Sequence, residues 1–441
     1  MCAIHESPKA LAVQLRVFNM LRFWQGVFNG SPALVLVVKS GHFIGPFFMA
    51  WAGLFFYRQA QIKTPLLEPA IVQSWRWLLG GFAVFVLVGV GLGLFHGNHA
   101  GHYELYVPFV LFPVMAWLIR AGQWSATPWL VAVAVGAVSA FSVAFYQSMF
   151  LGIGRAIGAT GNPIPFGNTA IVLAAICGVA AVMFPFVGPY SKLARALMWL
   201  GAIAGSGASL LSGSKGGWMS LFIIGVTVSY LSTQHWAAWR RHVAAGAVVL
   251  AIVVAGALAP AHVVKDRIAS GLAGGWHWLQ TGQVTEGSVS MRFEIWRLGA
   301  MVVAEKPWFG HGSVGAHERW DELAAQAPSH AELAQLYGST KFISSDNELL
   351  GALKGGGVVG ALAVFAAYLC VWMAFWRWRK HSDAQIKALA TIGMLMVPLY
   401  LEFGLSVSVF GINVFRSVYV ALAVSLLALI TVRLHHMRQP T

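Results

Sequence analysis

The chain has 441 residues, of which 58% are hydrophobic and only 10% are charged. Soluble globular domains carry about 25% charged residues, so this composition excludes an ordinary soluble enzyme and predicts an all-α polytopic membrane protein. The 29 Lys and Arg outnumber the 15 Asp and Glu, but most of them lie between apolar segments, where they set topology and meet anionic lipids rather than nucleic acid. The 3 cysteines are scattered and no Cys/His spacing indicates a metal site, so no disulfide framework, metal or cofactor is predicted.

Runs of about 17–25 predominantly apolar residues predict membrane spans. Twelve such runs lie near 11–29, 33–56, 75–95, 104–119, 128–150, 168–187, 195–212, 216–232, 243–260, 347–376, 385–407 and 412–432. Arg16 and Arg22 interrupt the first run, so an interfacial helix is the alternative there. The N-terminal ten residues lack the features of a cleaved signal peptide, and the first span is expected to direct insertion.

The distribution of Lys and Arg between the spans predicts the orientation. The basic residues that follow even-numbered spans are Arg58, Lys63, Arg76, Arg120, Lys192, Arg195, Arg240, Arg241, Arg377, Arg379, Lys380, Lys387, Arg433 and Arg438. Positive loops stay in the cytoplasm, so both termini are predicted to be cytoplasmic. The odd-numbered loops, including the long polar block 261–345, then face outward. We expect a single membrane domain, 1–441, with residues 261–345 as an outer helical subdomain.

Local signals predict helices within this outer block. Pro307 should stop a helix that runs from Arg292 to Glu305. Ser329-His-Ala-Glu332 is a capping box that should open a short helix ending at Gly338.

Three outer cations lie in unusual local settings. Arg155 lies in a glycine-rich loop, Lys215 in the tight turn Ser212–Trp218, and Arg292 at the start of an amphipathic helix with Trp296 one turn on. Such cations suit a phosphate-bearing lipid, because Arg binds phosphate oxygens in pairs and Lys acts as a point charge. The alternative is that each side chain simply extends to lipid headgroups.

Asp346 precedes the tenth span, and two interpretations stay open. It could cap that helix within the box Ser345–Glu348, or it could be a general base kept ionised by nearby cations. His311, His317 and His330 are alternative bases. Glu402 and Arg416 flank the last outer turn, where we expect an ion pair; charges at such depth are functional candidates.

Four of these segments resemble the motifs of one family, the O-antigen ligase and Wzy polymerase superfamily. Ser212-Gly-Ser-Lys-Gly-Gly-Trp218 is similar to its Ser-Gly-Ser-Arg-Gly-x-Trp signature. Ser290-x-Arg292-x-x-x-Trp296 with Pro307-x-x-Gly310-x-Gly312 resembles its outer-loop signature. Asp346-Asn-x-x-Leu349 with Gly357-x-x-Gly360 resembles its His-Asn-x-x-Leu and Gly-x-x-Gly segment, and Arg155 with Asn162-Pro-Ile164 resembles its Arg and Pro-Ile loop.

The resemblance implies a metal-independent, inverting glycosyltransferase of the GT-C type in a bacterial inner membrane. The donor would be a glycan on undecaprenyl diphosphate, bound at the periplasmic face. Arg155, Lys215 and Arg292 would neutralise the diphosphate, and Asp346 would deprotonate the acceptor hydroxyl. Asn347, Trp296, His311 and Arg416 would be accessory residues.

The acceptor distinguishes two enzyme classes. A ligase uses lipid A–core in lipopolysaccharide biosynthesis, whereas a polymerase uses a second lipid-linked glycan. Lys215 and Asp346 depart from the family's arginine and histidine, and the resemblance associates an aspartate more with the polymerases. A polysaccharide transporter or flippase would instead show inverted repeats and broken helices with ionisable groups at mid-membrane; neither is evident in the sequence.

Overall fold

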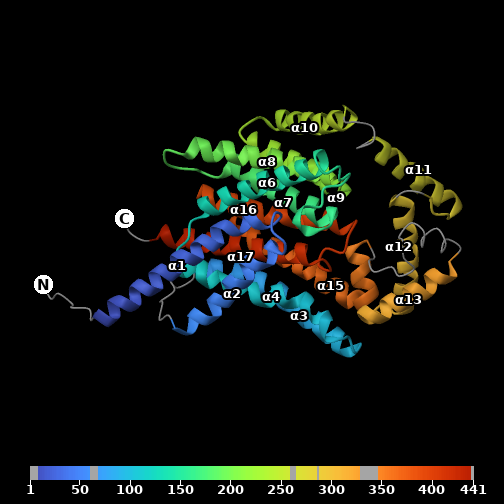
Figure 1. The fold of residues 1–441 in the computed structure, drawn as a ribbon, viewed down its shortest axis with the longest axis horizontal. Helices are drawn as coiled ribbons and strands as arrows, with labels where there is room; N and C mark the ends of the chain where they lie inside the picture. The colour runs from blue at the N-terminus through green and yellow to red at the C-terminus, as the bar shows by residue number, and fades with distance from the viewer. Residues whose placement is uncertain (1–7, 60–67, 259–264, 286–287, 328–345, 439–441) are drawn as a thin grey trace.

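The computed structural model describes residues 8–59, 68–258, 265–285, 288–327 and 346–438, and these contain helices and no strand (Figure 1). The first half comprises α1 (Pro8–Leu34), α2 (Gly41–Gln59), α3 (Pro69–Phe95), η1 (Ala100–Tyr106), α4 (Val107–Leu111), η2 (Phe112–Val114), α5 (Met115–Ala121), α6 (Ala126–Met149), η3 (Gly158–Thr160), α7 (Pro163–Met183) and α8 (Ser191–Ser212). The second half comprises α9 (Lys215–Ser232), α10 (Ala238–Leu258), α11 (Lys265–Thr281), α12 (Ser288–Glu305), α13 (Gly312–Gln326), α15 (Glu348–Trp376), η4 (Arg377–Lys380), α16 (Ala384–Gly404) and α17 (Asn413–His436).

Eight segments of the described chain are long and apolar enough to cross a membrane. They are Pro69–Phe95, Ala100–Ala121, Ala126–Met149, Pro163–Met183, Ser191–Ser212, Glu348–Lys380, Ala384–Gly404 and Asn413–His436, and each coincides with a predicted span. Gly41–Phe55 and Gly216–Ser232 match two further predictions but are shorter apolar stretches of 10–17 residues. The predicted spans near 11–29 and 243–260 fall in α1 and α10, which are not among the eight, so the total of twelve is not confirmed.

Helices α7 and α17 form the centre of the bundle, because nearly all of their residues are buried. The side chain of Asn162 accepts a hydrogen bond from the backbone N–H of Ile164 at 2.9 Å, and Pro163 follows, which starts α7. Small residues then let α8 approach α7 closely. A Cβ at Gly205 would lie 2.7 Å from the carbonyl oxygen of Ala170, as expected for glycine-mediated packing of membrane helices.

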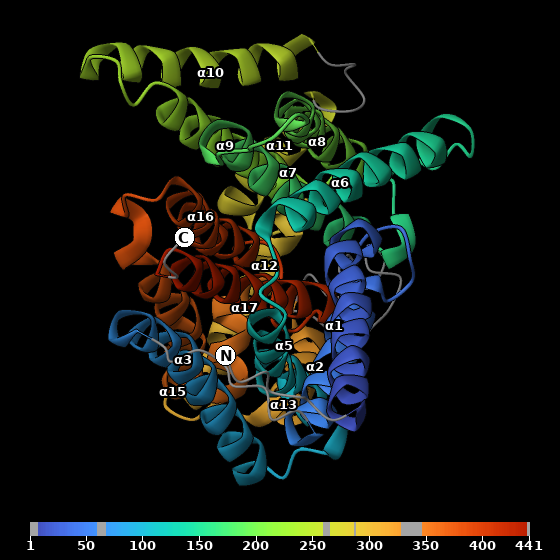
Figure 2. The same ribbon diagram turned by 90° about the vertical axis from the view of Figure 1, so that its left-hand side faces the viewer.

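The polar block lies at one end of the bundle. Figures 1 and 2 show the start of α1 and the end of α17 at one end, and α12 and α13 at the opposite end. Helix α12 ends at Glu305, as predicted from Pro307. This region has its own small apolar core, formed by Val284, Ile295, Leu298, Val302, Trp320 and Ala324. The predicted capping box at Ser329–Glu332 lies outside the described residues, and the limits of the subdomain stay a prediction.

Helix α15 is broken near its start. Gly357 has φ 61° and ψ −160°, which lie far from helical values, while the residues on both sides are helical. No broken helix was evident in the sequence, and the break at Gly357 corrects that expectation.

Candidate active site

The glycine-rich segment 307–312, which follows α12, docks into the break of α15. The break frees backbone N–H groups of the helix: that of Val358 donates to the carbonyl of Pro307 at 2.8 Å, and that of Val359 to the carbonyl of Trp308 at 3.2 Å. A Cβ at Gly357 would lie 2.2 Å from the carbonyl carbon of Trp308, and the residue has positive φ, so only glycine fits. The chain's own loop therefore satisfies these groups.

Two more glycines complete this contact. A Cβ at Gly310 would lie 2.6 Å from the carbonyl carbon of Gly355, and one at Gly312 would lie 2.6 Å from Cβ of His96 at the end of α3. The N–H of His311 donates to the carbonyl of Lys354 at 2.9 Å. The segments Pro307–Gly312 and Gly357–Gly360 are thus two halves of one packing site, which fixes α12 and α13 against α3 and α15.

This docking brings Arg292 of α12 to Asp346, two residues before the start of α15. Nε of Arg292 lies 3.9 Å from Oδ2 of Asp346, and the two side chains are 20% and 27% exposed. Gly299 lets the helices approach, because a Cβ there would lie 2.7 Å from a methyl carbon of Leu350. The structure therefore brings together the cation and the carboxylate that were predicted to carry the chemistry.

Two buried donors on α12 are unsatisfied within the part of the chain that the structure describes. Nε of Arg292 and Nε1 of Trp296 are both buried without an acceptor among the described residues. They lie one helical turn apart, on the same face of α12. Buried polar groups are normally paired, so the site has hydrogen-bonding capacity for an anionic oxygen of a ligand.

Asp346 is not the cap of α15. The side chain of Asn347 accepts the hydrogen bond from the backbone N–H of Leu350 at 2.9 Å and is the N-cap. Asp346 stands one residue earlier with φ 47°, a left-handed conformation that Asp and Asn tolerate better than most residues. Of the two interpretations left open for Asp346, the one in which it caps the helix is therefore wrong. Asn347, predicted to be accessory to the reaction, has this structural role.

A second cluster joins Arg155 to the turn between α8 and α9. Nε of Arg155 donates to the carbonyl of Ser212 at 3.1 Å, and its Nη2 to that of Gly213 at 3.4 Å. The hydroxyl of Ser214 donates to the Asn168 side chain at 2.5 Å, which holds the turn on α7. Lys215 is the first residue of α9. Two predicted segments far apart in the sequence therefore form one structural unit.

The turn between α16 and α17 lies between the two clusters. A Cβ at Gly216 would lie 3.2 Å from Oγ of Ser406, and a Cβ at Gly404 would lie 3.1 Å from Cβ of Glu348. The start of α9 thus lies close to this turn, and the start of α15 lies close to the end of α16 and, through Glu348, to the turn itself. The segments that contain the predicted cations therefore form two clusters, and both contact the residues around this turn.

Glu348, in the first turn of α15, was not predicted to belong to the site. It is 8% exposed, and its Oε2 accepts hydrogen bonds from the hydroxyl of Ser408 and the backbone N–H of Phe410, both at 3.2 Å. A carboxylate at the edge of an apolar span is a functional candidate, and this signal was present in the sequence.

Arg416 braces the same turn. Its Nη1 donates to the carbonyls of Phe410 at 3.3 Å and Gly411 at 3.1 Å. Glu402 instead accepts a hydrogen bond from the hydroxyl of Ser220 at 2.6 Å. The predicted ion pair between Glu402 and Arg416 is therefore wrong; Arg416 contributes to the site by holding the turn that contacts Glu348.

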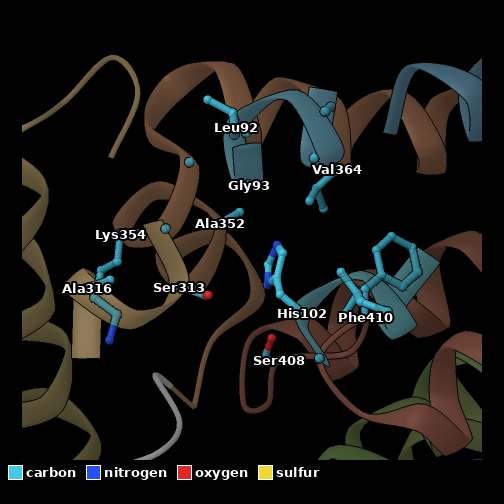
Figure 3. Close-up of a pocket in the computed structure, with 18 of the residues that line it drawn as sticks. Leu92, Gly93, His102, Ser313, Ala316, Ala352, Lys354, Val364, Ser408 and Phe410 are labelled. Atoms are coloured by element: carbon cyan, nitrogen blue, oxygen red, sulfur yellow. The ribbon is translucent and has the colours of Figure 1, made fainter. Parts of the chain in front are cut away.

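A cavity of about 430 Å³ lies beside the start of α15 (Figure 3). Its walls come from α3, η1, α13, α15 and the turn before α17. The imidazole of His102 stands near its middle, and the hydroxyls of Ser313 and Ser408 point toward it. Sequence reasoning missed His102, because nothing in residues 100–106 marks the segment as part of a site.

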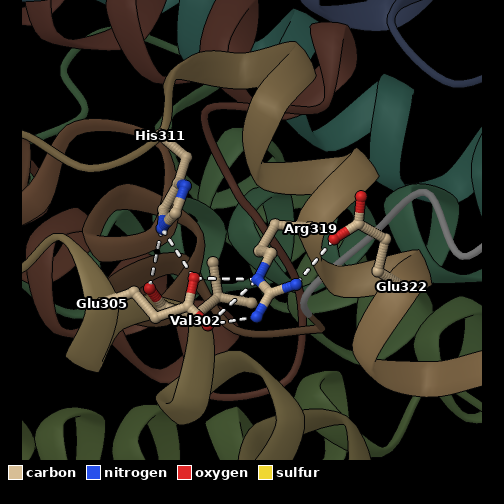
Figure 4. A network of polar contacts seen from close by, with 5 residues as sticks. All are labelled: Val302, Glu305, His311, Arg319 and Glu322. Atoms are coloured by element: carbon tan, nitrogen blue, oxygen red, sulfur yellow. Dashed lines mark hydrogen bonds and ion pairs between the residues drawn. The ribbon is translucent and has the colours of Figure 1, made fainter. Parts of the chain in front are cut away.

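His311 takes part in a polar network on the outer helices (Figure 4). Its Nε2 lies 3.1 Å from the carbonyl of Val302 and 3.8 Å from Oε2 of Glu305. A carbonyl only accepts, so Nε2 carries the proton and is not free to act as a base. Arg319 contacts Glu305 and Glu322, each at 2.7 Å. The hydrogen bonds from Arg319 hold the pKa of the Glu305 carboxyl below its ordinary value.

The two other predicted histidine bases are separate from this network. Nδ1 of His317 faces the carbonyl of Ser313, and His330 lies outside the described residues. Among the residues that the structure describes, no group of three or more His, Cys, Asp or Glu side chains could hold a metal ion. A metal-independent reaction stays a prediction.

Comparison with known proteins identifies the segment that contains most of these residues. Residues 200–365 match the family model described as O-antigen ligase. They include the α8–α9 turn, Arg292, Trp296, the docking segment, Asp346 and the broken start of α15. The chain is also 21% identical over 391 residues to a Haemophilus influenzae protein described only as uncharacterized, covering 86% of this chain and 91% of that protein. Residues 200–365 are therefore similar to the O-antigen ligase family, as the motifs in the sequence predicted.

Proposed function

We propose that the protein is a membrane glycosyltransferase that moves a glycan from undecaprenyl diphosphate to an acceptor hydroxyl at the periplasmic face of the inner membrane. The single observation that carries this proposal is the ion pair of Arg292 and Asp346 at 3.9 Å, with buried donors on Arg292 and Trp296 that have no hydrogen-bond acceptor within the described part of the chain. A cation and a free donor suit the diphosphate, and the neighbouring carboxylate suits the attacking hydroxyl.

The reaction is a single displacement. The carboxylate of Asp346 takes the proton of the acceptor hydroxyl, and the oxygen forms a bond to the anomeric carbon of the donor glycan. The bond between that carbon and the diphosphate oxygen breaks, and undecaprenyl diphosphate leaves with the electron pair. Attack opposite the leaving group inverts the configuration at that carbon.

Arg292 offsets the negative charge that develops on the diphosphate, and charge-assisted hydrogen bonds of this kind are strong. Arg155 and Lys215 add positive charge from the second cluster. Since Arg155 already donates to the carbonyls of Ser212 and Gly213, it also shapes the turn that carries Lys215.

The acceptor separates the two enzyme classes. We propose a ligase in lipopolysaccharide biosynthesis, with lipid A–core as acceptor, because the matching family model is described as O-antigen ligase. One observation favours a polymerase that extends O antigen or exopolysaccharide: Asp346 stands where the ligase motif has histidine. The transporter alternative is weaker, because the broken helix is filled by residues 307–312 rather than left open to a substrate path.

A deletion strain tests the proposal. If the protein is a ligase, lipopolysaccharide gels should show lipid A–core without O antigen, and lipid-linked glycan should accumulate. If it is a polymerase, lipid A–core should carry a single repeat unit. An unchanged glycan pattern in lipopolysaccharide and exopolysaccharide would contradict the proposal.

A further inference from the structure

The cavity beside the start of α15 has the size and construction of a ligand site. Its volume of about 430 Å³ lies within the range of about 300–1,000 Å³ that is typical of small-ligand pockets. It is lined by residues of several elements that are distant in sequence, including Gly93 of α3, His102 of η1, Ser313 of α13 and Ser408 of the turn between α16 and α17.

Glycines on one face of α3 make room for the aromatic side chains of η1. A Cβ at Gly89 would lie 2.1 Å from the hydroxyl of Tyr106, and one at Gly93 would lie 3.3 Å from a ring carbon of His102. The two glycines are one turn apart. Larger residues there would displace these rings, so the wall depends on glycine.

The polar groups that face the cavity are suited to neutral hydroxyls. His102 is a donor and acceptor, Ser313 and Ser408 are hydroxyls directed toward it (Figure 3), and Glu348 is a carboxylate that is 8% exposed. These are groups that fix the orientation of a ligand in a pocket. Because Glu348 accepts from Ser408 at 3.2 Å, the two side chains form a preorganised edge of the cavity.

The rest of the wall is mixed, with aromatic and apolar side chains beside the polar residues His96, Asn98, His317 and Lys354. Phe85 lies against Tyr106 and Phe410, with ring centroids 5.4 and 5.2 Å apart. A sugar ring presents apolar C–H faces as well as hydroxyls, so it matches both kinds of wall. Lys354 also lines the cavity, and it places its amino group over the ring of Trp320, 4.7 Å from the centroid, on the side away from His102 (Figure 3).

We propose that this cavity binds a sugar residue of the acceptor, next to the hydroxyl that is glycosylated. The inference rests on the proposed function, in which Asp346 takes the proton of that hydroxyl. Glu348 lines the cavity and stands two residues after Asp346. Consecutive Cα atoms are about 3.8 Å apart, so the two Cα atoms lie within about 8 Å of each other. A sugar held in the cavity can therefore present an adjacent hydroxyl to Asp346.

A substitution that fills the cavity with a larger side chain tests this assignment. Ala352 points into it (Figure 3), and Ala352→Trp should fill it. The matched control is Leu362→Trp on the same helix, where the side chain is 61% exposed. Purified variants would be given undecaprenyl-diphosphate-linked glycan as donor, with lipid A–core or a second lipid-linked glycan as acceptor, and donor binding would be measured separately.

We expect Ala352→Trp to lose transfer to the acceptor that the wild type uses and to keep donor binding, while Leu362→Trp keeps both. His102→Ala leaves the cavity open and should raise the acceptor KM by about tenfold to a hundredfold, the value of one or two ligand hydrogen bonds, with donor KM unchanged. His99→Ala, at an exposed histidine outside the cavity, is its control.

Two results with Ala352→Trp would overturn this inference without contradicting the proposed function. The first is normal transfer. The second is a loss of donor binding as large as the loss of transfer, which would assign the cavity to the donor. An unchanged acceptor KM in His102→Ala would also contradict it. If the proposed function is wrong, the result is different, because the wild-type protein itself would then transfer no glycan.

Discussion

The substitution Asp346→Asn separates catalysis from structure at the proposed base. Asn347, not Asp346, caps α15 through its bond to the N–H of Leu350 at 2.9 Å, so the change leaves the cap intact. Asparagine also tolerates the backbone φ of 47° at this position. The contact that is lost is the pair with Arg292 at 3.9 Å between partly exposed side chains, which contributes at most about 1 kcal/mol to stability.

The effect on rate should be much larger. Removal of a general base costs about 10²–10⁴-fold, equivalent to about 3–5 kcal/mol of activation free energy. The assay is single-turnover transfer by purified enzyme with lipid-linked donor, together with thermal unfolding in the same detergent. Asn347→Ala should show the reverse pattern: it removes the cap and lowers stability by about 1 kcal/mol, but it keeps the carboxylate.

Full turnover by Asp346→Asn would refute the assignment of the base. Equal losses of stability and activity in both variants would also refute it, because the two side chains would then act as one structural unit.

Three further predictions follow from the fold. Gly357→Ala should lower the free energy of unfolding by at least about 1–2 kcal/mol, the cost of a left-handed residue. Gly355→Ala should be tolerated, because the nearest atom to the added Cβ would be 4.0 Å away. Equal melting temperatures of the two variants would contradict the docking of residues 307–312. The folded pKa of Glu305 is lowered by its arginine partner, so the stability difference between wild type and Glu305→Gln should shrink as the pH falls below about 4.5, and a pH-independent difference would exclude this. A cysteine at Gln326 should react with an impermeant thiol reagent in spheroplasts and one at Ser382 should not, and the opposite labelling would reverse the orientation.

From the sequence we assigned Arg292 and Asp346 to one reaction, and that assignment stays a prediction; their contact was not predicted. Both residues lie in motifs that resemble those of one family, whereas their proximity depends on the glycine contacts between residues 307–312 and the break at Gly357. A glycine pair in a span, such as Gly357 and Gly360, is compatible with either close helix packing or a kink. Only the segment that packs against it, here residues 307–312, decides between them.

Two features of the site could not be predicted because they are tertiary. The N-cap moved from Asp346 to Asn347 because Asp346 adopts a left-handed conformation, and helix ends predicted from capping residues are uncertain by a residue or two. His102 enters the cavity from η1, and only the packing of η1 on the glycines of α3 places it there.

The membrane spans also show which features follow from the local sequence and which depend on tertiary packing. Hydropathy located the eight long apolar segments well, because each is a nearly uninterrupted apolar run. It extended the second span over 33–56, where the chain turns between Leu34 and Gly41 and divides that run between α1 and α2. Short breaks of this kind depend on packing and carry little hydropathy signal.

The reconstituted reaction tests the central claim most directly. Purified wild-type protein would be incubated with undecaprenyl-diphosphate glycan and lipid A–core, or with a second lipid-linked glycan, and the products would be separated by mass. We predict glycosyl transfer with inversion to one of these acceptors and release of undecaprenyl diphosphate. An Arg292→Ala variant that still inserts into the membrane should lose transfer, and Arg292→Lys should recover part of it. Transfer by Arg292→Ala at the wild-type rate, or no transfer to either acceptor by the wild type, would contradict the account.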